Sequence, residues 1–203
     1  MGALALDVSN VNPASEADVR ASGAVLLICK ATEGSTFLDK TLNTHRAIAK
    51  KIGIRFGVYV FLHALAQGDE AGVLLAWAKP KPGELIFIDS EPGGQDNATV
   101  SQMAHRTNLC AQGLEAKGHR PILYASSSYW LQMVACEPSL RRLRVWEAEY
   151  PRRGLTRFFP RLFRLRQKLR HGASVVMWQA TDAYLVGNRK FDASLILVDP
   201  KKL

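Results

Sequence analysis

The chain has 203 residues, of which 47% are hydrophobic and 22% are charged, as in one globular domain and unlike a disordered or fibrous chain. It contains no apolar run of the roughly 20 residues that a membrane-spanning helix needs, and its N-terminus has no signal-peptide pattern. The formal net charge of +9 favours an anionic partner, and nucleic acid, an acidic membrane surface and the bacterial cell wall all carry the required charge.

The chain begins with a short strand that ends in an acid. Residues 3–7 form an apolar run that closes with Asp7 and is followed by turn-forming residues. A short capped helix is expected at 15–20, and the next apolar run predicts a second strand at 24–29. This strand leads to Glu33, so a second acid lies just beyond a strand end.

The same order of helix and strand continues along the chain. Apolar residues recur at helical spacing within 39–52, which predicts a helix there, and a strand that carries Tyr59 is expected at 56–62. Another helical spacing covers 69–78, before a connection that is rich in proline. Each strand is therefore expected to alternate with a helix.

The next strand, at 85–89, brings two carboxylates to its end. Side chains alternate across a strand, so Asp89 and Glu91 should point to the same side. Pro92 and the glycines after it end the strand and leave both acids at its rim. Two adjacent acids are what cleavage of a glycosidic bond needs, although acids that merely face water would give the same pattern.

The C-terminal half repeats the alternation. Helices are expected at 98–117 and 126–135. Strands are expected at 121–125, 143–148, 174–179 and 195–198. Eight strand candidates in about 200 residues indicate a compact, incomplete or flattened (β/α) TIM-like barrel of mostly parallel strands, formed by a single domain, 1–203.

The acids and one amide fall where such a barrel carries its active site. Catalytic groups of these barrels come from the C-terminal ends of several strands. The polar residues in that position here are Asp7, Glu33, Asp89, Glu91 and Gln179. Independent acids at one end of a shared sheet favour a catalytic site over a chance pair.

The cysteines and histidines give no sign of a metal site or a disulfide framework. Cys29, Cys110 and Cys136 are an odd number without metal-site spacing, and Cys29 lies in an apolar run. Buried free thiols are the expected state. The five histidines share no metal-ligand spacing either, so neither a metal nor an organic cofactor is expected.

An ordered series of motifs across the whole chain resembles the lysozymes of glycoside hydrolase family 25, muramidases of bacteriophages, bacteria and some fungi. The matching motifs are Leu6-Asp7-Val8-Ser9, Lys30-Ala31-Thr32-Glu33-Gly34, Gly57-Val58-Tyr59-Val60-Phe61, Ile88-Asp89-Ser90-Glu91, Pro121-Ile122-Leu123-Tyr124, Val145-Trp146-Glu147-Ala148-Glu149-Tyr150, Trp178-Gln179-Ala180-Thr181 and Phe191-Asp192. The chain departs from the family pattern at Val60, where a histidine is common, and at 10–12 after the first motif.

The resemblance implies a flattened β/α barrel that cleaves the β-1,4 bond between N-acetylmuramic acid and N-acetylglucosamine in peptidoglycan without a cofactor. It implies that Glu91 is the general acid/base, that Asp89 is its carboxylate partner, and that Asp7 and Asp192 are flanking acids. Residues expected to bind substrate are Glu33, Tyr59, Tyr124, Trp146, Trp178 and Gln179. Asp89 is expected to stay ionised, either as the nucleophile or as the stabiliser of an oxazolinium formed by the substrate's N-acetyl group.

The segment 152–170 interleaves arginines with phenylalanine and leucine. A barrel helix with a cationic outer face gives this pattern, and so does a helix that lies on an anionic membrane or binds nucleic acid. We favour the barrel helix, whose charge would hold the enzyme near anionic wall polymers or outer-membrane lipid. Nucleic acid is not expected as a partner.

Two rival functions use the same residues. The acids Asp7, Asp89, Glu91 and Asp192 would serve as oxygen ligands in a metal-dependent hydrolase. A non-catalytic barrel that binds the cell wall is the other rival. The favoured interpretation is a monomeric, phage endolysin-like muramidase without a separate wall-binding domain, which remains in the host cytoplasm until it is released to the wall.

Overall fold

The computed structural model describes residues 3–65, 67–92, 97–150 and 174–203. Its strands are β1 (Ala3–Val8), β2 (Leu26–Glu33), β3 (Phe37–Leu38), β4 (Arg55–Phe61), β5 (Leu85–Asp89), β6 (Ile122–Ser126), β7 (Arg144–Ala148), β8 (Ser174–Val186) and β9 (Arg189–Ile196). Its helices are α1 (Glu16–Ser22), α2 (Leu42–Ile52), α3 (Glu70–Ala78), α4 (Val100–Glu115) and α5 (Ser127–Cys136), with two 3₁₀ turns, Pro138–Arg142 and Pro200–Lys202.

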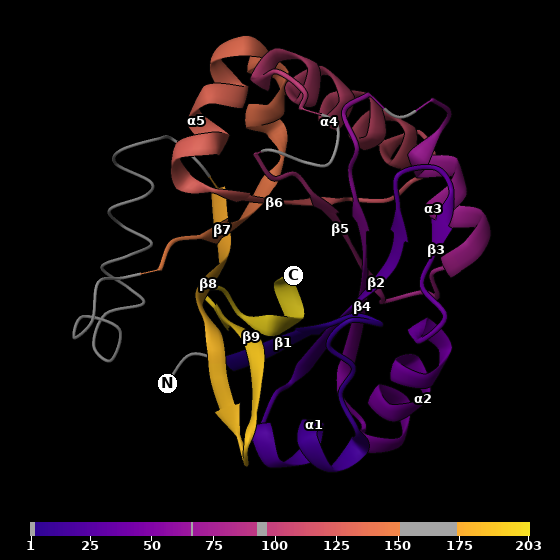
Figure 1. Ribbon diagram of the computed structural model, residues 1–203, viewed down its shortest axis with the longest axis vertical. Coiled ribbons are helices and arrows are strands. Elements are labelled where there is room, and N and C mark those ends of the chain that lie inside the picture. The colour runs from indigo at the N-terminus through magenta and orange to yellow at the C-terminus, as the bar shows by residue number, and fades with distance from the viewer. Residues whose placement is uncertain (1–2, 66, 93–96, 151–173) are drawn as a thin grey trace.

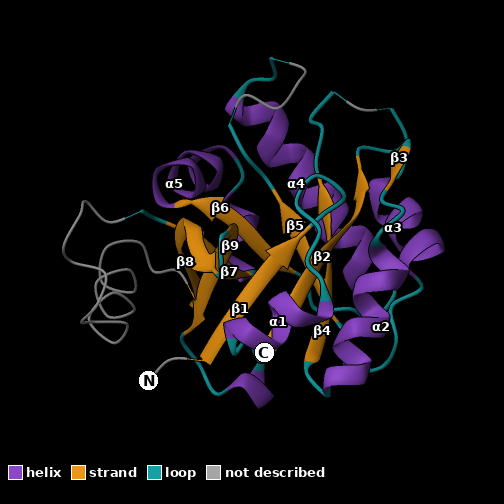
Figure 2. Cartoon of the chain, turned by 60° about the horizontal axis from the view of Figure 1, so that its bottom comes forward, coloured by secondary structure: helices purple, strands orange, loops and turns teal. Residues whose placement is uncertain are grey.

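The strands close into a barrel (Figure 1). Their order is β1-β9-β8-β7-β6-β5-β4-β2, and a further pairing of β1 with β2 closes the ring, while β3 pairs only with β2. The pairs from β1 through β2, β4, β5, β6 and β7 to β8 are parallel. The predicted TIM-like (β/α) barrel is confirmed. The helices lie outside the ring of strands, with α2 and α3 together on one side (Figure 2).

The C-terminal end of the barrel differs from the sequence prediction. A short last strand was expected at 195–198, but β9 starts at Arg189 and runs antiparallel to both β8 and β1. The reason is a tight turn after β8 in which Gly187 has a φ of +62°, a conformation that glycine adopts without steric cost. The two strands therefore form a hairpin instead of a βα unit.

Two apolar layers hold the barrel together. The outer layer packs the helices against the strands, and the inner layer fills the ring. Inside the ring, Trp146 packs edge-on against Phe87 and Tyr124, with ring centroids 5.2 and 4.6 Å apart. The Trp146 indole nitrogen also donates a hydrogen bond to Ser194 Oγ at 2.9 Å. The barrel interior is thus packed below the level of the site, as in other barrels of this kind.

Gly57 of β4 lies against the inner layer, and its missing side chain is part of that packing. A Cβ at this position would lie 2.7 Å from Phe87 Cε2 and 3.3 Å from the backbone oxygen of Leu85. We expect Gly57→Ala to destabilise the fold by about 1–3 kcal/mol through overpacking, measured by urea unfolding. Adding Phe87→Leu should recover part of this loss, and a Gly57→Ala protein as stable as the parent would contradict the expected clash.

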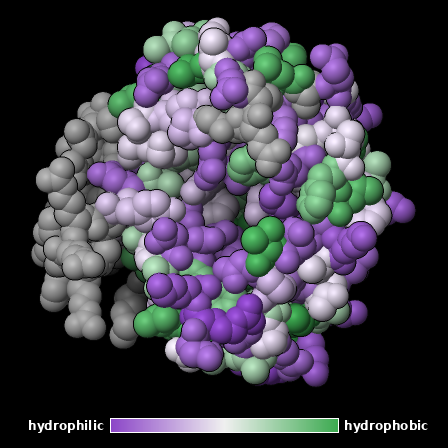
Figure 3. All heavy atoms as spheres, in the orientation of Figure 1, coloured by the Kyte–Doolittle hydropathy of each residue, from purple (hydrophilic) through white to green (hydrophobic). Residues whose placement is uncertain are grey.

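The cysteine prediction holds for two of the three thiols. All three cysteines are free; Cys29 and Cys110 are buried, but Cys136 is exposed because it lies in the last turn of α5 on the solvent side. Among the described residues, no helix is long and apolar enough to cross a membrane. Hydrophilic residues cover most of the face drawn in Figure 3. The arginine-rich segment 152–170 lies outside the described residues.

Candidate active site

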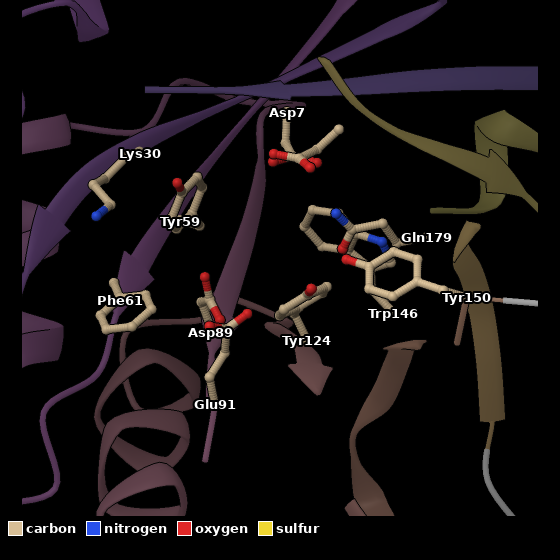
Figure 4. A pocket seen from close by; sticks show the side chains of 11 residues that line it. Asp7, Lys30, Tyr59, Phe61, Asp89, Glu91, Tyr124, Trp146, Tyr150 and Gln179 are labelled. Atoms are coloured by element: carbon tan, nitrogen blue, oxygen red, sulfur yellow. The ribbon is translucent and has the colours of Figure 1, made fainter. Parts of the chain in front are cut away.

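Four carboxylates converge on one cavity at the end of the barrel where the parallel strands finish (Figure 4). Asp7 of β1 is directly opposite Asp192 of β9 in the strand register, and Asp89 ends β5, with Glu91 two residues on. The cavity has a volume of about 240 Å³. Its walls are formed by Asp7, Lys30, Tyr59, Phe61, Asp89, Glu91, Tyr124, Trp146, Tyr150, Gln179 and Asp192.

The position of each acid follows from strand geometry. Asp89 and Glu91 lie side by side at the cavity because residues two apart in an extended chain face the same way. Asp192 reaches the same cavity only because β9 is antiparallel and adds to β1. The structure thus brings together all four acids that were predicted to be catalytic.

Burial raises the pKa of every acid in this cluster, and repulsion between the acids adds to the rise for Asp7, Asp89 and Asp192. Burial, followed by repulsion from Asp192 and Glu91, raises the pKa of Asp7 well above its usual value. Burial is also the main reason that the pKa of Asp89 is raised, with repulsion from Glu91 and Asp7 added to it. Like charges this close cannot all ionise together, so the cavity retains protons at a pH where isolated carboxyls lose them.

The raised pKa of Asp89 is contrary to the expectation that this residue stays ionised in the free protein. Asp89 lies deep at the strand end, and its Oδ1 is buried without a hydrogen-bond partner among the described residues, as is Oδ2 of Asp7. Unpaired buried oxygens of this kind are costly in the free protein. Each of them offers a hydrogen-bonding position to a group that enters the cavity.

Glu91 lies closer to solvent and has polar neighbours. Burial raises its pKa, while a hydrogen bond with Tyr124 and the charge of Lys30 oppose that rise. Figure 4 shows the Tyr124 ring beside the two carboxylates. A carboxyl group with a raised pKa that faces a cavity is suited to donate a proton near neutral pH.

Glu33 lies at the end of β2 but does not line the cavity. Its carboxylate accepts from Lys30 Nζ at 2.5 Å and lies 3.2 Å from Nε2 of His63. Lys30 itself does line the cavity and lies over the Phe61 ring, with Nζ 4.9 Å from the ring centroid. Glu33 therefore orients Lys30, and its expected contact with substrate stays a prediction.

Three of the four predicted aromatic residues, Tyr59, Tyr124 and Trp146, line the cavity. Trp178 does not: it packs in the outer layer, and its indole nitrogen donates to the backbone oxygen of Glu149 at 2.8 Å. Trp178 and Gln179 are neighbours on β8, so they face opposite sides of the sheet, and Gln179 is the one that faces the cavity.

Three residues that line the cavity, Lys30, Phe61 and Tyr150, were not predicted from the sequence as site residues. The alternation of β4 contained the signal for Phe61, because residues two apart share a face and Tyr59 was already selected. Lys30 and Tyr150 lie in motifs that carry the family resemblance. A lysine at a strand end usually extends into solvent, but this one pairs with Glu33, three residues on, and lines the cavity.

Asp192 gives a test of the electrostatics through stability. Burial, with repulsion from Asp182 and Glu91, raises its pKa from 3.8 to about 6. The folded state binds this proton more tightly than the unfolded state. Proton binding at Asp192 therefore contributes fully to the free energy of unfolding below pH 4, and this contribution is lost as the pH rises through 6. Between pH 4 and pH 8, the free energy of unfolding of Asp192→Asn should rise by about 1–2 kcal/mol relative to that of the parent, after allowance for solvent screening. Urea unfolding of both proteins at both pH values measures this change. The same difference in unfolding free energy between variant and parent at pH 4 and at pH 8 would contradict it.

No group of three or more histidine, cysteine, aspartate or glutamate side chains in the described part of the chain is arranged to hold a metal ion. The four carboxylates of the cavity therefore enter the proposed chemistry as acids and charges. Removal of divalent cations with a chelator tests whether a metal contributes.

The comparisons with known proteins identify the family of the chain. Residues 6–189 match the model of the family described as glycosyl hydrolases family 25. No curated protein sequence matches the chain. The structure is similar to the lysozyme of Streptomyces coelicolor, with a TM-score of 0.78 and 19% identity over 100% of this chain and 95% of that one.

Two further solved structures share the fold. The muramidase from Acremonium alcalophilum has a TM-score of 0.77 and 19% identity over 98% of this chain and 96% of that one. The catalytic domain of endolysin ply40, from bacteriophage P40 of Listeria monocytogenes, has a TM-score of 0.65 and 18% identity over 97% and 93%. Because the family match covers nearly the whole length and includes all the carboxylates except Asp192, the chain belongs to family 25 of the glycosyl hydrolases and is a glycoside hydrolase.

Proposed function

We propose that this protein is a peptidoglycan hydrolase that cleaves the β-1,4 bond between N-acetylmuramic acid and N-acetylglucosamine. The observation that carries the proposal is the pair Asp89 and Glu91, side by side in a cavity of about 240 Å³ at the end of a family 25 barrel. The solved structures with this fold include a lysozyme and a muramidase. A glycosidic bond needs one carboxyl that gives a proton and one negative charge near the sugar carbon.

Glu91 is the proton donor in this proposal. Its pKa is raised by burial, so the carboxyl group binds a proton more tightly than an isolated glutamic acid does. It protonates the glycosidic oxygen as the bond breaks, and as a carboxylate it then takes a proton from the attacking water. Tyr124, hydrogen-bonded to Glu91, would fix the direction of the carboxyl group.

Asp89 stabilises, as a carboxylate, the positive charge that the sugar develops, because a cation beside a carboxyl group lowers the pKa that burial had raised. Its unpaired buried Oδ1 would accept the N–H of the substrate's N-acetyl group, whose carbonyl oxygen attacks the sugar carbon and forms an oxazolinium. This gives retention of configuration without a covalent bond to the protein, one of the exceptions to the two-carboxylate scheme. Asp7 and Asp192 add negative potential on the opposite wall of the cavity.

The test is hydrolysis of purified cell walls, followed by turbidity and released reducing ends. We expect clearing with new reducing ends, and we expect glycan whose N-acetyl groups have been removed to be cut at least about 100-fold more slowly. Equal rates on both glycans would remove the N-acetyl group from the mechanism. Binding to walls without any released reducing ends would favour the rival, a non-catalytic wall-binding barrel.

A chelator separates the proposal from the other rival, a metal-dependent hydrolase. Carboxylate oxygens are ligands that magnesium and calcium prefer, which is why this alternative is tested, although no group of such ligands in the described part of the chain is arranged to hold a metal ion. Activity that persists after exhaustive treatment with EDTA is expected for the glycosidase. Activity that is lost with EDTA and restored by a divalent cation would favour the metal-dependent enzyme.

We also propose that the enzyme acts in phage-mediated lysis, as a monomer that reaches the wall after release from the host cytoplasm. The similarity to a phage endolysin supports this biological role. The expected natural substrate is then the peptidoglycan of the host. Expression in a bacterial host together with a membrane-permeabilising agent should cause lysis, and lysis should not follow with the agent alone.

A further inference from the structure

A basic groove with an exposed tryptophan lies between α2 and α3, on the outside of the barrel. Its volume is about 530 Å³. We call it the α2–α3 groove, and it is lined by Asn43, Arg46, Ala47, Lys50, Ala76, Trp77, Ala78, Lys79 and Lys81. Figure 2 shows α2 and α3 as neighbours on the outside of the barrel. Both helices end where β4 and β5 begin, so the groove reaches toward the barrel end opposite the catalytic cavity.

Three lysines give the groove its positive charge. Lys50, Lys79 and Lys81 are exposed, and no ion pair of theirs is found among the described residues. Lys50 is in the last turn of α2, while Lys79 and Lys81 follow the end of α3. Because the lysines come from two helices, their charges converge on one groove instead of spreading along a single face.

An ion pair makes the wall of the groove rigid. Arg46 donates to both oxygens of Glu84, at 2.9 and 3.0 Å, and to the backbone oxygen of Ala78 at 2.7 Å. This two-point contact fixes α2 to the chain beyond α3. Arg46 is neutralised by Glu84, so the three lysines remain as uncompensated cations.

Trp77 supplies a flat apolar surface among these charges. It is 38% exposed, while Leu74 and Ala78 of the same helix are buried in the outer layer. Its neighbours in the groove, Ala47 and Ala76, are small, so they leave room beside the indole. An exposed tryptophan between cations is suited to a ligand that carries both an apolar face and negative groups.

Lys79 occupies a position where glycine is the usual residue. It caps the C-terminus of α3 in the left-handed conformation, with a φ of +42°, which a side chain makes unfavourable. The groove therefore has a lysine at a position where glycine would fit the backbone better.

We propose that the α2–α3 groove binds a phosphodiester-linked, glycosylated polymer of the bacterial cell wall. A sugar ring would lie on Trp77, and phosphate groups would lie against the ammonium groups of Lys50, Lys79 and Lys81, since lysine binds phosphate as a point charge. The groove contains one exposed aromatic side chain, whereas channels for single-stranded nucleic acid stack successive bases on several, so a glycosylated polymer fits better. The proposal rests on the proposed function only in that the wall is where the enzyme works.

The test measures binding of a lipid-free poly(glycerol phosphate) that carries sugar substituents, by titration calorimetry on the full chain at low salt. The Glu91→Gln variant serves as the background, so that binding is read without hydrolysis. The groove variant carries Lys50→Gln, Lys79→Gln and Lys81→Gln. The matched control variant removes the same charge at exposed lysines elsewhere, Lys117→Gln, Lys201→Gln and Lys202→Gln.

The groove variant is expected to bind at least 10-fold more weakly, and the control variant to change less than 3-fold. Trp77→Ala should weaken binding of the glycosylated polymer more than that of the bare polymer. Equal losses in groove and control variants, or equal affinity for single-stranded RNA of the same charge, would overturn the proposal. If the groove variant loses binding of the polymer and the control variant keeps it, while the parent fails to cut peptidoglycan, the proposed function is refuted and this inference stands.

Discussion

Glu91→Gln is expected to lower the rate of peptidoglycan hydrolysis by at least about 100-fold, and by up to about 10,000-fold, because general acid catalysis contributes rates of that order. Glutamine keeps the size of the side chain and its hydrogen bond with Tyr124, but it cannot give a proton to the glycosidic oxygen. The initial rate of reducing-end release, at a saturating concentration of purified walls, measures the effect.

The control for this variant is Glu115→Gln, which changes the same atoms on the surface. Glu115 ends α4, is exposed and pairs with Arg142 at 2.9 Å. It does not line the cavity, so its loss should leave the rate within about twofold. Circular dichroism and urea unfolding establish that both variants are folded. A Glu91→Gln protein with the parent's rate would mean that another group donates the proton.

Asp89→Asn is expected to give the second large loss, about 100-fold in kcat with little change in KM. The carboxylate is proposed to act on the charged intermediate more than on the bound substrate, and an interaction made mainly in the transition state appears in kcat. Asparagine fills the same space but carries no charge to balance the oxazolinium. Steady-state rates on a soluble glycan chain give both constants.

Stability separates this effect from damage to the fold. Asp89 is buried with a raised pKa and an unpaired oxygen, so ionising it costs folding free energy at pH 8. Asp89→Asn should therefore be at least as stable as the parent at that pH, while its activity falls. Asp199→Asn, at an exposed position that does not line the cavity, is the matched control and should keep most of the rate. A fall in stability that parallels the loss of rate would indicate a structural role for Asp89 instead.

Most strands and helices of the first two thirds of the barrel could be predicted because their signals are local, although the two-residue strand β3 was not predicted. The α1 helix begins at Ser15, whose side chain accepts from the Asp18 backbone, and ends at Gly23 with a φ of +70°; both signals are readable in the sequence. The apolar run before Asp89 likewise gave β5 its position. These elements depend on spacing and capping more than on distant contacts.

The β8–β9 hairpin could not be predicted in the same way. β8 extends to Val186 through a stretch with exposed polar residues, and its partner β9 also pairs with β1 at the other end of the chain. Such pairing depends on tertiary contacts, which single-strand propensities do not encode. Asp192 was nevertheless selected, because the resemblance supplied it where the strand pattern did not.

Protonation was the least predictable feature of the site. Sequence spacing places Asp89 and Glu91 on one side of a chain, but it does not show which of them is deeper. The structure gives Asp89 the more buried place, with Asp7 opposite, so repulsion and desolvation act on it together. The order in which four close acids titrate depends on these distances and on burial, and it can be read only from the assembled barrel.

The most direct measurement is mass spectrometry of the fragments that the enzyme releases from peptidoglycan of defined composition. After reduction of the products with borohydride, muramidase chemistry predicts disaccharide-based fragments whose reduced end is N-acetylmuramic acid. Fragments with a reduced N-acetylglucosamine end, or fragments cut only in the peptides, would contradict the assignment of the Asp89 and Glu91 cavity to that chemistry.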